Sequence, residues 1–166
     1  MLALSTGIGP DNIDIVMNEL DALVNIDLKT REQLPHHRSL TIVRIGTSGT
    51  LHADIPIGTH VIASHGLGMD GSLNYYRELD DVTDKELTGE FARQTNWPAF
   101  LPSPYIIPGT PALIQKLSTG AITGITATAG GFYGPQGRQL RLHNSFPGML
   151  EAMAKFSFKE HRIINF

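Results

Sequence analysis

The sequence predicts an α/β fold with a mixed, mostly parallel central sheet flanked by helices. Apolar, β-branched runs alternate along the chain with amphipathic helical patterns, as in strands joined by crossover helices. One run, residues 40–45, is continuously apolar, which is typical of a strand covered on both faces. The 166 residues suffice for one domain with a sizeable core, so 1–166 is predicted to be a single domain.

The first part of the chain is predicted to contain a strand, a helix and a second strand. The short apolar run 2–6 leads into a glycine turn and indicates a strand. A helix should begin at Pro10 and Asp11, because proline fits the first turn and an acidic group favours that end. Apolar residues then recur at helical spacing as far as Val24. Residues 28–39 are polar and indicate a loop, and residues 40–45 indicate a strand.

The rest of the chain alternates between the two kinds of element. Residues 97–108 carry four prolines and are predicted to be irregular. A turn is expected at 55–58. The other predicted elements are strands at 59–64, 121–129 and 162–166 and helices at 86–94, 111–117 and 148–156.

The composition narrows the class of protein. Hydrophobic residues at 41% and charged residues at 17% indicate a globular chain and argue against a disordered one. A net charge of -3 gives no electrostatic reason to expect nucleic acid or a membrane as partner. The absence of cysteine excludes disulfides and thiolate chemistry. No apolar stretch is long enough for a bilayer span, and we expect a cytoplasmic protein.

The segment Arg44-Ile45-Gly46-Thr47-Ser48-Gly49 is typical of an anion-binding turn at the end of a strand. The guanidinium of Arg44 can bind two phosphate oxygens at once. Thr47 and Ser48 add hydroxyl donors, and the glycines let backbone amides approach an anion. An ordinary turn with a salt-bridged arginine accounts for the same motif about equally well.

A second glycine-rich segment, residues 131–138, places Phe132, Gln136 and Arg138 on one short loop. An aromatic ring offers a stacking surface for a nucleobase, and a glutamine amide can both donate to a uracil carbonyl and accept from the ring N–H. A guanidinium at the other carbonyl would stabilise the negative charge that develops on a departing base. The alternative is a polar surface loop with Phe132 packed in the core.

Together the two segments resemble the nucleoside phosphorylase family, and most closely its uridine phosphorylase branch. The resemblance implies that phosphate binds at Arg44, Ile45, Gly46 and Thr47. It places the nucleoside at Ser48, Gly49, Phe132, Gln136, Gly137 and Arg138, with Arg138 as the catalytic residue. Residues 5–9 also match a family segment, with a structural role at the turn into the first helix.

The resemblance implies phosphorolysis of a pyrimidine nucleoside, uridine and phosphate giving uracil and ribose 1-phosphate, in pyrimidine salvage. Phosphate is the co-substrate, no cofactor is implied, and a homo-oligomer is expected where the full fold is present. No metal is predicted, because the seven histidines show no ligand spacing and an upstream carboxylate partner of the family is missing. Deoxyuridine and thymidine remain open as substrates.

The resemblance covers the central portion of a usual family member. The upstream phosphate-binding segment and a downstream Glu-Met-Glu ribose-binding segment of the family have no counterpart in the chain. We therefore expect an incomplete phosphorylase fold that turns over poorly by itself. Two alternatives stay open: a purine nucleoside phosphorylase or nucleosidase, against which Gln136 and Arg138 argue, and a non-catalytic fragment of the fold.

Overall fold

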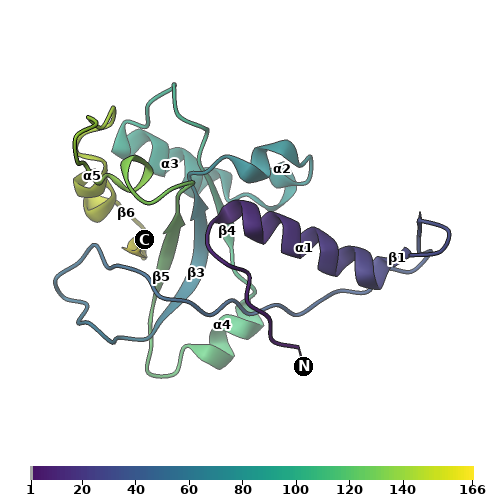
Figure 1. The fold of residues 1–166 in the computed structure, drawn as a ribbon. Coiled ribbons are helices and arrows are strands. Elements are labelled where there is room, and N and C mark those ends of the chain that lie inside the picture. The colour runs from purple at the N-terminus through teal and green to yellow at the C-terminus, as the bar shows by residue number, and fades with distance from the viewer. Residues whose placement is uncertain (1) are drawn as a thin grey trace. The chain divides into compact units, whose positions relative to one another are not determined.

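The computed structural model describes residues 2–166, and the chain divides into two compact units, residues 2–47 and residues 48–166. Whether the chain acts as one domain stays a prediction. Each unit has its own secondary structure, shown by the ribbon in Figure 1. Among residues 2–166, no helix has the length and apolar character needed to cross a bilayer.

The N-terminal unit is built on one helix, α1 (Pro10–Asn25), which confirms the helix predicted from the apolar spacing. It begins after Gly9, whose φ of 103° suits glycine, with Pro10 and Asp11 in its first turn. Two short antiparallel strands follow, β1 (Ile26–Asp27) and β2 (Glu32–Gln33). Asn25 at the end of α1 is buried, and its Oδ1 accepts a 2.7 Å hydrogen bond from the Arg38 amide.

The two strands predicted in this unit are wrong. Residues 2–6 and 40–45 belong to no strand, and their apolar side chains are exposed: Leu2 is 75% and Ile45 91% exposed. A strand needs a neighbouring strand for its backbone hydrogen bonds. The only strand pair among residues 2–47 joins β1 to β2, so neither apolar run has such a neighbour.

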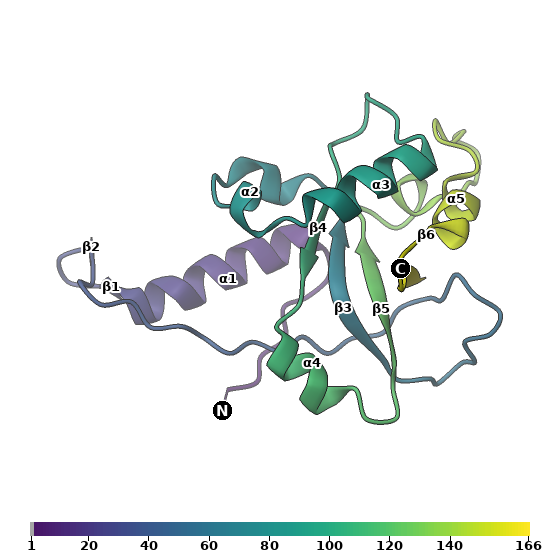
Figure 2. The ribbon, with the colours of Figure 1, turned by 180° about the vertical axis from the view of Figure 1, so that it is seen from behind.

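The C-terminal unit contains a five-stranded mixed sheet in the order β4-β3-β5-β7-β6. The three central strands β3 (Val61–Gly68), β5 (Ile122–Thr128) and β7 (His161–Asn165) run parallel, as Figures 1 and 2 show for β3 and β5. The edge strands β4 (Tyr105–Pro108) and β6 (Ser157–Phe158) are antiparallel to their neighbours. This sheet confirms the predicted fold class.

The helices of this unit confirm the helical patterns of the sequence. The predicted helices are α3 (Lys85–Thr95), α4 (Pro111–Leu117) and α5 (Met149–Lys155). The single turn α2 (Leu79–Val82) and the 3-10 helices η1 (Ser72–Tyr75) and η2 (Gly134–Gln136) were not predicted. The prediction that 97–108 is irregular is wrong at its end, where β4 pairs with β3. An edge strand tolerates Pro108, because one of its sides needs no partner.

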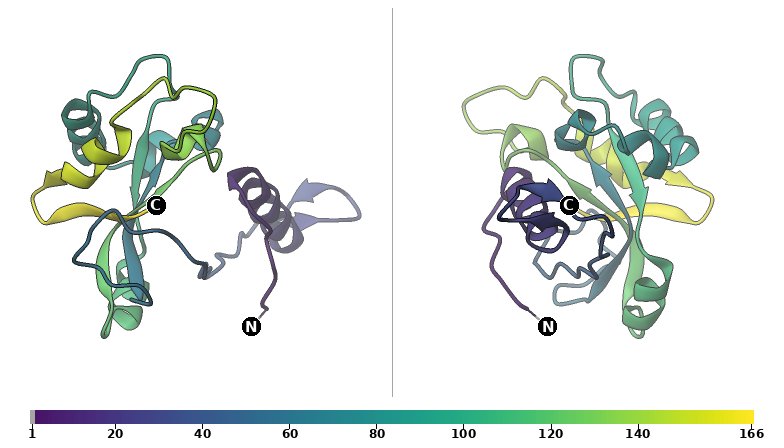
Figure 3. Two further views of the ribbon diagram at one scale, coloured as in Figure 1. Left: turned by 60° about the vertical axis from the view of Figure 1, so that its left-hand side comes forward. Right: turned by 90° about the vertical axis from the view of Figure 1, so that its right-hand side faces the viewer.

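The core of the C-terminal unit lies between the sheet and the helices α3 and α5. Figure 3 shows both helices on the same side of the sheet. The ring of Phe91 on α3 packs edge-on against Phe156 at 5.5 Å between centroids. Buried residues of the cluster include Leu67, Leu87, Phe91, Ile106, Ile125, Met153, Phe156 and Ile163. This packing fixes the strand ends from which the candidate site is built.

Candidate functional site

The candidate site lies at the carboxyl ends of the three parallel strands. Because β3, β5 and β7 run in the same direction, the segments that follow them leave the same edge of the sheet. The Met69 amide after β3 donates to the carbonyl of Thr128 at the end of β5, at 2.9 Å. In open α/β sheets this edge is where ligands bind.

Ser48 and Gly49 lie beside the end of β7. Gly49 exchanges two backbone hydrogen bonds with Phe166, at 3.0 and 2.8 Å. Thr50 forms a β-bridge with Asn165, and the Nδ2 of Asn165 donates to Oγ of Ser48 at 2.6 Å. These two residues, predicted to contact the nucleoside, are therefore held at the carboxyl edge of the sheet.

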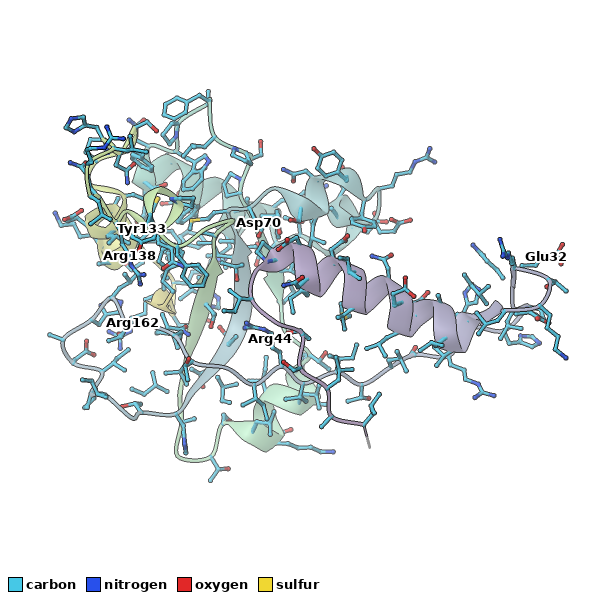
Figure 4. All side chains as sticks on the ribbon, viewed as in Figure 1. Glu32, Arg44, Asp70, Tyr133, Arg138 and Arg162 are labelled. Carbon is cyan, nitrogen blue, oxygen red and sulfur yellow. The ribbon has the colours of Figure 1, made fainter. Side chains whose placement is uncertain are left out.

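The predicted base-binding residues share one tight loop that follows β5. The backbone amides of Gln136 and Arg138 both donate to the carbonyl of Tyr133, each at 2.9 Å. Gly137 between them has φ of 69°, and a methyl group there would lie 2.8 Å from Cγ of Leu150. Figure 4 shows Tyr133 and Arg138 on this loop. The turn therefore requires glycine at position 137 and keeps Gln136 and Arg138 two residues apart.

The side chains of this loop are available to a ligand. Phe132 is 51% exposed, which rules out the alternative in which its ring is a core residue. Arg138 is exposed and has no ion-pair partner among residues 48–166. An aromatic face and an unpaired guanidinium on one loop can stack on a planar ring and bind its oxygens.

Asp70, which the sequence analysis did not single out, organises the end of β3. Its Oδ1 accepts hydrogen bonds from the Ser72 amide at 2.6 Å and from the Tyr105 hydroxyl at 2.9 Å. Burial, together with this carboxylate, raises the pKa of Tyr105. Gly130, just before the loop of residues 131–138, lies against Asp70, since a methyl group on Gly130 would be 3.8 Å from the Cβ of Asp70. An Asp-Gly pair directly after a strand was the signal available in the sequence.

The predicted phosphate-binding residues Arg44, Ile45, Gly46 and Thr47 all belong to the N-terminal unit. They are exposed, and the strand expected to carry them is not formed. The Arg44 guanidinium turns back toward Gly46, where a methyl group would lie 3.7 Å from Nη1. The salt bridge considered for Arg44 is not formed within residues 2–47. Phosphate binding by these residues stays a prediction.

The histidines form no cluster of metal ligands within residues 2–166. Among residues 2–166, no three His, Asp or Glu side chains gather closely enough to hold an ion. His65 and His161 pack edge to face at 4.6 Å between ring centroids. Burial lowers the pKa of His65, and the nearby His161 adds to this shift. The absence of a metal from the protein's chemistry stays a prediction.

Comparison with known proteins identifies the family. The family model described as "Phosphorylase superfamily" matches residues 1–154. The chain belongs to the phosphorylase superfamily.

A crystal structure of Trypanosoma brucei nucleoside phosphorylase, described as showing uridine phosphorylase activity, is similar to the chain with a TM-score of 0.78 and 26% sequence identity. The similarity covers 97% of this chain and 61% of that one, so the chain spans less than two thirds of its relative. No curated protein sequence matches the chain significantly.

Proposed function

We propose that this member of the phosphorylase superfamily splits a pyrimidine nucleoside with phosphate, converting uridine and phosphate to uracil and ribose 1-phosphate. The observation that carries the proposal is the placement of Phe132, Gln136 and Arg138 on one loop at the carboxyl edge, where Ser48 and Gly49 also lie. The uridine phosphorylase activity of the trypanosomal relative supports it.

The loop of residues 131–138, here called the base loop, has the chemistry to hold a departing uracil. Gln136 can pair with one carbonyl and the ring N–H, while Phe132 stacks on the ring face. When the bond between the sugar and N1 breaks, its electron pair moves onto the uracil ring and its carbonyl oxygens. The fixed charge of Arg138 then interacts more strongly with the leaving group than with bound uridine, and this difference lowers the barrier.

In this proposal, Arg44 and Thr47 bind the attacking phosphate. A phosphate oxygen forms the new bond to the anomeric carbon as the bond to N1 breaks, and the uracil anion takes up a proton from solvent. No side chain becomes covalently attached, so catalysis rests on positioning and charge stabilisation. We propose that no metal or organic cofactor takes part.

We also propose the assembly, the metabolic role and the location of the protein. The family resemblance supports a homo-oligomer and a role in pyrimidine salvage, and the composition supports a cytoplasmic protein that binds neither nucleic acid nor membrane. A purine substrate is disfavoured, because an amide and a guanidinium two residues apart match the two carbonyls of uracil.

The test compares uridine with inosine, each with and without phosphate, in both a turnover assay and a binding titration. We expect uridine to bind and to be cleaved only with phosphate, and Arg138→Ala to lower kcat by roughly 100-fold or more. Arg141→Ala, on an exposed residue three positions along the chain, is the matched control and should leave the rate unchanged. Preference for inosine would favour the purine alternative. Failure to bind either nucleoside would favour the non-catalytic alternative.

A further inference from the structure

Three polar side chains from distant parts of the chain form a hydrogen-bonded relay at the carboxyl edge. The hydroxyl of Thr126 on β5 donates to Oδ1 of Asn165 on β7 at 2.8 Å, and Nδ2 of Asn165 donates to Oγ of Ser48 at 2.6 Å. Thr126 and Asn165 are register partners in the sheet. Asn165 is only 5% exposed, so its amide has few other partners.

The relay has a direction, because the two ends of an amide are chemically different. The carbonyl end can only accept and the NH₂ end can only donate. With Thr126 donating to Oδ1, the NH₂ group of Asn165 faces Ser48. Ser48 then accepts through its oxygen, and its own hydroxyl proton is not used within the relay. Because Ser48 is exposed, that proton is available to a ligand.

We propose that Asn165 is a positioning residue that fixes Ser48 as a hydrogen-bond donor to an oxygen of the bound ribose or phosphate. This inference rests on the proposed function, and it assigns to Asn165 and Thr126 a role that acts through Ser48 alone. A hydroxyl whose acceptor side is already occupied loses less rotational freedom when it donates to a ligand. The next residue, Gly49, is held in place by its two backbone hydrogen bonds with Phe166.

A purely structural role makes a different prediction. If the Thr126–Asn165 bond only joined β5 to β7, removing it would lower stability without altering how Ser48 meets a ligand. The two roles therefore separate in a double-mutant cycle, in which ligand affinity is measured with and without the Ser48 hydroxyl.

The experiment measures the dissociation constants of uridine and of inorganic phosphate for the full chain. Thr126→Val keeps the side-chain shape but removes the donor, and we expect it to weaken the binding of one of the two ligands about three- to tenfold. Thr126→Ser should restore binding. Thr123→Val, the same change on an exposed threonine three residues earlier on β5, is the matched control and should have no effect.

The decisive measurement is Thr126→Val in a Ser48→Ala background, where we expect no further loss of affinity. An equal loss with and without the Ser48 hydroxyl would overturn the relay while leaving the proposed function intact. A wild-type chain that binds neither uridine nor phosphate would overturn both. If uridine loses affinity, Ser48 contacts a ribose oxygen, and if phosphate loses affinity, Ser48 contacts a phosphate oxygen. Restored binding in Thr126→Ser shows that the loss in Thr126→Val comes from the missing hydroxyl and not from misfolding.

Discussion

Apolar runs of the same kind form buried strands in one unit and no strand in the other. In residues 48–166, apolar runs pair into a sheet and bury Leu67, Ile125 and Ile163 beneath α3 and α5. In residues 2–47, equally apolar runs form no strand, and Asn25 is the only buried residue. A hydrophobic pattern therefore specifies a buried strand only where neighbouring segments supply hydrogen bonds and a packing surface.

The largest expected difference between the units is in the cost of removing an apolar side chain. Phe91 is fully buried between Trp97 and Phe156, so Phe91→Ala should lower the free energy of unfolding by about 3–5 kcal/mol. Ile15 on α1 is 59% exposed, and Ile15→Ala should cost less than about 1 kcal/mol. Urea denaturation of the two variants measures both. Equal losses would show that α1 is packed as tightly as α3.

The second contrast concerns glycines with and without room for a side chain. A methyl group on Gly68 would overlap the Tyr105 ring, and shifting that ring would strain its hydrogen bond to Asp70. We expect Gly68→Ala to cost about 1–3 kcal/mol in unfolding free energy. A methyl group on Gly46 would meet only the guanidinium end of the Arg44 side chain, at 3.7 Å or more, so Gly46→Ala should change the unfolding free energy by less than about 0.5 kcal/mol. Thermal unfolding of both variants tests the contrast, and an unaltered midpoint for Gly68→Ala would contradict it.

The third prediction concerns the one buried polar residue of the N-terminal unit. Asn25 bonds to both the amide and the carbonyl of Arg38 and to the carboxylate of Asp21. Asn25→Ala should lower the free energy of local opening by about 1–2 kcal/mol, because the Arg38 groups lose their partners. Hydrogen exchange should accelerate at residues 26–38 and stay constant in α3. Asn18→Ala, on an exposed part of α1, is the control, and faster exchange throughout the chain would refute a local role.

The smallest effect should be a dependence of the unfolding free energy on pH, which arises from His65 in the C-terminal unit. Burial and the neighbouring His161 hold the pKa of His65 below its ordinary 6.5, although Asp84 and Glu160 oppose the shift. The folded chain thus binds fewer protons than the unfolded chain, so unfolding free energy is highest above pH 6.5 and falls as the pH drops from 6.5 toward the lowered pKa. His65→Gln should flatten this decline, whereas His36→Gln, on an exposed residue, should not. A decline that persists in His65→Gln would assign it to other groups.

Many of the helices and strands could be predicted from the sequence, because each depends on a pattern of neighbouring residues. The helical spacing from Ile13 to Val24 and the run rich in threonine and isoleucine that becomes β5 both depend on residues close in sequence. The failures involve partners that local patterns cannot show. Residues 40–45 have strand composition but pair with no strand within residues 2–47, and β4 forms among prolines because β3 lies beside it.

The candidate site also has features that the sequence shows and contacts that it does not show. The residue types on the base loop are evident in the sequence, since Gly137 and the short spacing of Gln136 and Arg138 indicate a tight turn. The contacts of Asn165 with Thr126 and Ser48 were not predicted, because they join segments far apart in the chain.

The bridge between Ser48–Thr50 and the end of β7 also bears on folding kinetics. Ser48 and Asn165 are 117 positions apart, whereas the β6–β7 hairpin is local. Closing so long a loop costs entropy that only the finished sheet can repay, so we expect this bridge to form late. The carboxyl edge of the sheet would then be among the last parts of the chain to order during refolding.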